Sequence, residues 1–268
     1  ESTQLLPDGS ILLGSADASF TLLSPDGQVR LQQGSDALLP TDPTELYTDD
    51  TGARVWLRYG PKPGDSYGFA LDQLVRESRL QLGKPVSDRL HPPRIEVPAA
   101  HTLNGWRRAT MVTLDGAALP IRGEEPHSLA VSPDGRSFVL GTSGALRRFP
   151  FERSAGASDC RLPPSANASS LPSPCFETPL PARALAVNYS GDGRYLVAAL
   201  SDGSLRWFSA SDGQPIVTLV LHRDRRRWVM FQPHGHYAAT IAGASLVGWL
   251  VNPAQPQAAT LFPLERFV

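Results

Sequence analysis

The sequence predicts an all-β protein built from four-stranded antiparallel units. The clearest unit spans residues 184–220, where three Asp-Gly turns separate apolar runs at 185–189, 194–200, 204–208 and 214–220. Asp-Gly between partly alternating apolar runs is the strongest local signal for a β-hairpin, because glycine accepts a positive φ and aspartate tolerates it. Four antiparallel strands in so short a stretch make one blade of a β-propeller.

Related turns recur along the chain and predict five blade-like units within one propeller domain. Ser-Pro-Asp-Gly stands at 24–27 and again at 132–135, and Gln-Pro-His-Gly stands at 232–235. Gly193 and Gly235 follow one another at the ~40–45-residue spacing of successive propeller blades. The predicted units are residues 1–38, 39–90, 91–152, 182–221 and 226–262.

The first two units are predicted from apolar runs that flank short turns. The first begins with a turn at Asp8-Gly9 that leads into an apolar strand, and two more strands flank Asp26-Gly27. These make three strands in all, so we expect a blade without its first strand. The second has predicted strands at 44–47, 53–59, 67–71 and 74–82. The following stretch, 83–101, is rich in proline, which removes backbone donors, so any strand there is short or at an edge.

The later units are read in the same way. A hairpin is predicted around Asp115-Gly116, followed by strands at 128–131, 137–141 and 145–149. Residues 154–181 are rich in serine and proline and are predicted to form a long loop inserted between blades. The last unit has predicted strands at 228–231, 236–240 and 245–251.

The number of blades stays open at this stage. Propellers close with ~4–8 blades, so five units could close a ring by themselves. The incomplete first unit also fits a six- or seven-bladed ring, whose remaining blades either stand before residue 1 or come from another chain.

The clearest unit also resembles a known family. Residues 202–208, Asp-Gly-Ser-Leu-Arg-Trp-Phe, followed by Asp212-Gly213, resemble the end of a WD40 repeat, although Trp207-Phe208 stands where that family has Trp-Asp. The resemblance implies that Asp202 bonds backbone amides of its turn. For Trp207, Trp228 and Trp249, packing between blades is a better interpretation than a ligand-binding cage.

From residue 103 onward, a series of motifs resembles the WD40 propellers that accompany a caspase-like (metacaspase-type) protease domain in bacterial multidomain proteins. The motifs stand at 125–135, 222–224, 227–229, 233–237, 246–252 and 262–267. The last blade departs from the family pattern, because Pro-His-Gly-His-Tyr-Ala stands where Pro-Glu-Gly-Tyr-Tyr-Asp is usual. The resemblance implies a regulatory or recruitment module for a protease that is not in this chain.

Composition limits the classes of partner. The formal net charge is -1, so nothing in the total indicates binding to nucleic acid or to an anionic membrane. No apolar run approaches the ~20 residues of a membrane-spanning helix. All but two of the 25 basic residues are arginine, a skew that suggests a GC-rich bacterial genome. We expect a cytoplasmic protein unless the two cysteines form a disulfide.

The two cysteines, Cys160 and Cys175, leave the compartment open. They could form a disulfide, which would place the chain in an oxidising, extracytoplasmic compartment, or they could remain reduced thiols.

The candidate partner-binding residues are Arg223, Arg225, Arg226, Arg227, His234 and His236. The arginines could contact an acidic partner or a nucleic-acid phosphate. A solvated loop between blades is the better interpretation, because the chain as a whole is not basic. The two histidines are too few for a zinc site without a third ligand. The chain offers no nucleophile, phosphate-binding or dinucleotide-binding motif in the right context, so we expect no enzyme, catalytic residue, metal or cofactor. A propeller enzyme with its site at the central channel remains the alternative.

Overall fold

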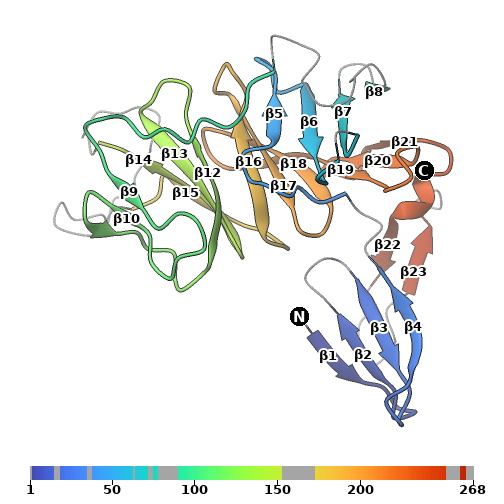
Figure 1. The fold of residues 1–268 in the computed structure, drawn as a ribbon. Coiled ribbons are helices and arrows are strands. Elements are labelled where there is room, and N and C mark those ends of the chain that lie inside the picture. Colours follow the sequence, from blue (N-terminus) through green and yellow to red (C-terminus); the bar gives the residue numbers. More distant parts are fainter. Residues whose placement is uncertain are drawn as a thin grey trace.

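The computed structural model describes residues 2–14, 19–34, 38–62, 64–71, 75–77, 90–152, 173–251 and 260–263. These residues form antiparallel β-sheets, and their single helical element is the short 3-10 turn η1 (Ala244–Leu246) (Figure 1). In the described ranges no helix is long and apolar enough to cross a bilayer. The predicted all-β fold class is therefore confirmed.

The first two sheets each have four strands paired in chain order. One sheet contains β1 (Ser2–Leu5), β2 (Ile11–Gly14), β3 (Phe20–Leu23) and β4 (Val29–Gln33). The other contains β5 (Leu46–Thr48), β6 (Arg54–Arg58), β7 (Ser66–Ala70) and β8 (Val75–Glu77). The expectation that the first unit lacks a strand was wrong, because Ser2–Leu5 pairs with Ile11–Gly14 and supplies it.

The middle of the chain forms a three-stranded and a four-stranded sheet. The first contains β9 (Leu103–Asn104), β10 (Thr113–Leu114) and β11 (Ala117–Ala118). The second contains β12 (Pro126–Val131), β13 (Ser137–Thr142), β14 (Ala145–Pro150) and β15 (Phe176–Pro179). The predicted loop 154–181 was thus wrong at its end, because β15 pairs with β14 and completes a blade.

The rest of the chain begins with the clearest predicted unit. Its four strands and three Asp-Gly turns are confirmed as β16 (Ala184–Tyr189), β17 (Tyr195–Leu200), β18 (Ser204–Ser209) and β19 (Pro215–Leu221). Two further strands extend this sheet beyond β19, β20 (Trp228–Phe231) and β21 (Tyr237–Ala239). A separate pair follows, β22 (Gly248–Val251) and β23 (Thr260–Pro263). The chain after residue 226 therefore does not form one independent four-stranded sheet in the described residues.

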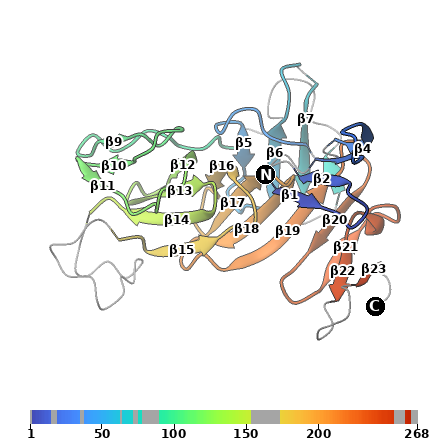
Figure 2. The ribbon, with the colours of Figure 1, turned by 90° about the horizontal axis from the view of Figure 1, so that it is seen from below.

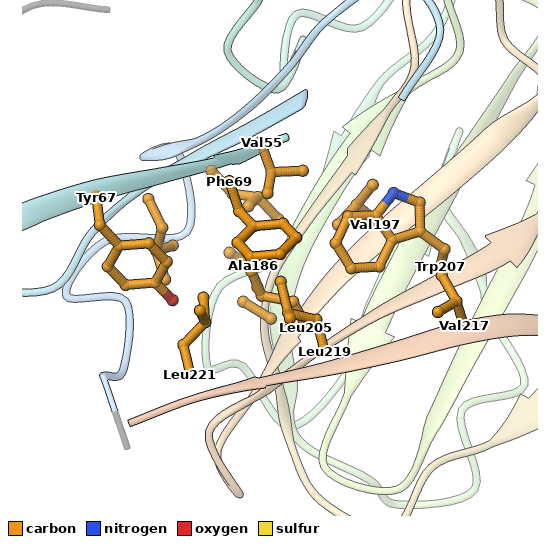
Figure 3. Close-up of a cluster of buried hydrophobic side chains, with 13 residues drawn as sticks. Val55, Tyr67, Phe69, Ala186, Val197, Leu205, Trp207, Val217, Leu219 and Leu221 are labelled. Carbon is orange, nitrogen blue, oxygen red and sulfur yellow. The ribbon is translucent and has the colours of Figure 1, made fainter. Parts of the chain in front are cut away.

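The β16–β19 sheet is apolar on both faces, and each face is covered by another sheet. Side chains alternate across the pleat, so Val197 points to one face and Leu196 to the other. The first face packs against β5–β8 in a cluster that includes Phe69 and Trp207 (Figure 3). The second face packs against β12–β15. The Trp207 indole Nε1 also donates to Gly52 O at 2.7 Å, which joins two sheets through a buried hydrogen bond.

The order of the sheets in space differs from their order in the chain. Residues 91–152 separate β5–β8 from β16–β19 in sequence, yet the two sheets lie side by side, with β12–β15 on the far side of β16–β19 (Figures 1 and 2). An extended segment at 91–94 makes this possible by crossing their first strands. It bridges to Thr48 of β5, and Arg94 O accepts from the Val131 amide of β12 at 2.7 Å.

The β1–β4 sheet is set apart from this row of sheets in Figure 1. Its close strand contacts are within the sheet itself. Large apolar side chains on it are open to solvent, with Leu5 71%, Val29 59% and Leu31 48% exposed. The register places Val29 beside Leu23 and Leu31 beside Leu22, so apolar residues lie on both faces. The sheet has the composition of a blade that is packed between two others.

Asn188 on β16 gives a test of the arrangement of sheets. Its buried Nδ2 donates to Leu46 O and to His91 O, both at 2.8 Å. We expect Asn188→Ala to lower the free energy of unfolding by about 2–4 kcal/mol, because two buried carbonyls lose their donor. Urea denaturation measures this. Asn104→Ala, at an exposed position of β9, is the control, and an equally small effect of both changes would contradict the contact.

Candidate functional site

The arginine-rich segment forms a tight turn between β19 and β20, here called the Arg turn (His222–Arg227). Asp224 organises it, since its Oδ1 accepts from the backbone amides of Arg226 at 2.8 Å and Arg227 at 2.9 Å. These backbone hydrogen bonds hold the pKa of the Asp224 carboxyl far below its usual range. The acidic residue that interrupts the basic cluster in the sequence is therefore the residue that fixes the shape of the turn.

The arginines of the turn have different roles. Arg227 folds back, with its Nε 2.6 Å from Asp224 Oδ2 and a terminal nitrogen 2.7 Å from His222 Nε2. Arg225 has a positive φ of 60°, and its guanidinium carbon lies 5.3 Å from the ring centroid of Tyr59. Both side chains thus support the turn. Arg223 and Arg226 are exposed, so they present their charge on the outer surface.

The contact between Arg225 and Tyr59 places the Arg turn against the β6–β7 loop. Tyr59 follows β6, and the same loop carries the exposed Lys62. A cation over an aromatic ring contributes ~0.5–1 kcal/mol at an exposed site, which helps to balance the cost of the positive φ at Arg225. The turn is consequently a shaped basic surface supported by a neighbouring sheet.

The structure does not bring the candidate histidines to the Arg turn. His234 and His236 are exposed in the β20–β21 turn, where the Gln232 amide donates to His236 O at 2.8 Å. Successive turns of an antiparallel meander lie at opposite ends of its strands, so the histidines and the arginines lie at opposite ends of β20. The described residues hold no group of three side chains that could bind a metal ion.

The sequence also singled out structural residues, and most of them lie in the described ranges. Asp202 Oδ1 accepts from the Ser204 amide at 2.9 Å and from its hydroxyl at 2.6 Å. Trp207 is buried between sheets, and Trp228 contacts Phe69 edge to face with ring centroids 5.1 Å apart. Trp249 lies on β22, and its side chain is outside the described part of the chain. Each described residue of this set therefore makes structural contacts.

Cys175 lies just before β15 and is disulfide-bonded. Cys160, the partner considered from the sequence, falls outside the described residues. The Cys175 amide donates to Arg148 O at 2.7 Å, so this end of the disulfide is attached to the β12–β15 sheet.

Sequence reasoning missed a buried ionic cluster on β14. The Arg147 side chain is 0% exposed and makes a bidentate pair with Glu124, with both N–O distances 2.8 Å. Its Nε lies 3.2 Å from Glu177 Oε2, but the geometry is too poor for a hydrogen bond there. An arginine beside Leu146 and Phe149 in an apolar strand was the available signal. Arg147 is buried and bonded to Glu124 and to the Thr142 hydroxyl, which is consistent with a structural role for the cluster.

Comparisons with known proteins add no family assignment. No family model matches the sequence, and no curated protein matches it. Three solved structures cover most of the chain. The β-propeller domain of Cps50 (Swd1) from Myceliophteria thermophila is 9% identical, with a TM-score of 0.32, over 89% of this chain and 84% of that chain. The C-terminal WD40 domain of Sif2 is 10% identical, with a TM-score of 0.34, over 88% and 68%.

The third structure is a chain of the mitotic checkpoint complex, 12% identical with a TM-score of 0.35 over 86% of this chain and 69% of that chain. None of the three descriptions mentions a protease. Likeness at these TM-scores assigns neither a family nor a partner to this chain, so the function has to be argued from its own surface.

The ionic cluster makes stability depend on pH. Hydrogen bonds from Arg147 hold the pKa of Glu124 below its ordinary value of 4.5. The carboxylate therefore stabilises the fold fully above that value, and the contribution is lost as the pH falls through it and below. We expect Glu124→Gln to lower the free energy of unfolding at pH 7 by about 2 kcal/mol and to reduce its fall on acidification.

Chemical denaturation at pH 7, 5.5 and 3.5 measures both effects. Glu152→Gln, at an exposed position after β14, is the control. Parallel pH profiles for the wild-type chain and Glu124→Gln would contradict the stabilising role of the cluster.

Proposed function

We propose that this chain is a non-catalytic protein-interaction module and that the Arg turn binds an acidic segment of a protein partner. The observation that carries the proposal is that Asp224 and Arg227 hold the turn rigid while Arg226 faces solvent. A preformed turn loses little conformational entropy on binding, which favours recognition. The net charge of -1 argues against a nucleic-acid partner, because basic surfaces that bind phosphates usually belong to basic domains.

The resemblance of residues 103–267 to propellers beside caspase-like proteases suggests the partner. We propose an effector of that class, which the module would recruit or regulate in a bacterial cytoplasm. A chain that supplies further blades is the other protein partner considered, and the exposed apolar side chains on β1–β4 are consistent with it.

One observation bears on the alternative of a propeller enzyme. A propeller enzyme would place its site at the central channel, where the first strands of the blades meet. Here the extended segment 91–94 lies across β5, β16 and β12, and the Asn188 side-chain amide donates a hydrogen bond to His91 O of that segment.

The binding proposal is tested by removing charge without disturbing the turn. We expect Arg226→Ala to weaken retention of the partner, because this arginine faces solvent, whereas Arg225 and Arg227 support the turn and stay in place. Arg136→Ala removes the same charge from another exposed position and is the matched control.

Tagged versions of the three proteins would be purified from the native cell at low and at physiological salt, and the retained proteins identified by mass spectrometry. Retention of a caspase-like protein by wild type and control, with reduced retention by the Arg226→Ala variant and at higher salt, supports the proposal. Recovery of the same protein set with all three chains would contradict it.

A second candidate function is an extracytoplasmic binding protein, which the disulfide at Cys175 favours. Stable disulfides persist in oxidising compartments and are rare in the cytosol. We expect the intact mass of the natively expressed chain, alkylated without reductant, to show no modified cysteine, and two modified cysteines after reduction. Alkylation of both cysteines before reduction would instead indicate reduced thiols and a cytoplasmic protein.

A further inference from the structure

A cavity of about 520 Å³ lies between the β12–β15 and β16–β19 sheets, at one end of their strands. Its lining comes from the β12–β13, β16–β17 and β18–β19 turns, together with the buried residues Arg148 of β14 and Tyr189 of β16. Ligand sites usually have volumes of ~300–1,000 Å³ and combine an apolar surface with a few polar groups. This cavity has the size of such a site, and it lies at the opposite end of β19 from the Arg turn.

Two of the lining turns are copies of one structure. In the β12–β13 turn, the Ser132 hydroxyl donates to Asp134 Oδ1 at 2.6 Å, and the Arg136 amide donates to the same oxygen at 3.0 Å. In the β16–β17 turn, Asp192 Oδ1 accepts from the corresponding hydroxyl and amide at the same distances. Each turn therefore uses one oxygen of its carboxylate to hold its own shape.

The second oxygen of each carboxylate remains available to a ligand. Asp134 and Asp192 are exposed at the mouth of the cavity, and in the described part of the chain no group donates a hydrogen bond to either Oδ2. The two turns also adjoin, since a Cβ atom on Gly193 would lie 3.6 Å from Pro133 Cδ. Two acceptors from neighbouring turns thus stand at the mouth of one cavity.

The formal charges that line the cavity cancel. Arg148 contributes a buried positive charge, held by hydrogen bonds to Ala210 O and Ser137 Oγ, both at 3.0 Å. Arg194 contributes a second positive charge at the mouth, where its guanidinium carbon lies 5.5 Å from the ring centroid of Tyr195. These two arginines balance the two aspartates. The cavity therefore offers hydrogen-bond acceptors without a net negative charge, which favours a neutral donor over a cation.

Tyr195 gives the mouth of the cavity an aromatic surface. The residue is half-buried at the start of β17 and is part of the cavity lining. Its Cβ and Cδ2 atoms lie 3.5 Å from the position of a Cβ atom on Gly52 in the neighbouring β5–β6 turn. This contact holds the ring in place. An aromatic ring beside charged acceptors suits a ligand that has both C–H and O–H groups.

We propose that this cavity binds a neutral pyranose sugar. Two hydroxyls of the sugar would donate to Asp134 Oδ2 and Asp192 Oδ2, in hydrogen bonds that are strengthened by the charge of the acceptor. A C–H face of the ring would lie against Tyr195. A basic side chain from a partner could also donate to the carboxylates, but Arg148 and Arg194 would repel its charge. The site is separate from the Arg turn, so either can exist without the other.

The test titrates methyl glucoside and methyl galactoside into the isotopically labelled chain, each also as its anionic uronate and its cationic amino-sugar form. The amide signals of Gly193 and Ser211 report on the cavity. We expect saturable shifts with a neutral glycoside, affinity at least about tenfold lower for its uronate, and no gain for its amino-sugar form. Tightest binding by a charged form, or no saturable shift with either neutral glycoside, would overturn the proposal. An equal response to acetylasparagine amide would overturn it too, because it would indicate an amide ligand.

Two variants test the carboxylate contacts without removing the turns. Asp192→Asn keeps an oxygen for the Ser190 hydroxyl and the Arg194 amide, but its nitrogen replaces the second oxygen with a donor. Asp134→Asn makes the same change in the adjoining turn. We expect each variant to bind the neutral glycoside about tenfold more weakly, because a charged acceptor is lost.

The matched control is Asp26→Asn, which makes the same change in the corresponding turn of β1–β4, where the Ser24 hydroxyl donates to Asp26 Oδ1. This turn is not part of the cavity lining, so the control should bind as wild type. Undiminished binding by both Asp192→Asn and Asp134→Asn would contradict the site, and so would an equal loss of binding in the control.

Discussion

The arrangement of this protein depends on one constraint, which is that a β-sheet apolar on both faces must be covered on both. The β16–β19 sheet meets the constraint by packing between β5–β8 and β12–β15. Dispersion and burial then act on two sides of each strand, and polar groups are left to the strand ends. Buried hydrogen bonds across the contacts, such as Trp207 to Gly52, fix how the sheets are aligned. The β1–β4 sheet has the same two-faced composition but lacks such covers in the described chain.

The same constraint places the exposed charged side chains in the turns. Because the sheet faces are used for packing, exposed charge collects where strands reverse. Aspartate has two roles there. Asp192 and Asp224 use their carboxylates to bond backbone amides, which makes the turns rigid. Rigid turns then position neighbouring arginines toward solvent or toward a cavity. A WD40-like sequence pattern is therefore compatible with many binding specificities, since the pattern determines the turn and not the partner.

The sequence predicted the strands and turns that depend on neighbouring residues, and it missed the contacts between segments that are far apart in the chain. The strands around Asp202-Gly203 followed from turn chemistry and alternation over a few residues, and they are confirmed. The position of β5–β8 beside β16–β19 depends on contacts such as Asn188 to Leu46, far apart in sequence, for which no local pattern exists. The Arg turn was a candidate from its composition. Its division into supporting and outward-facing arginines needed the position of Tyr59, and the cavity at Tyr189 needed two sheets to meet.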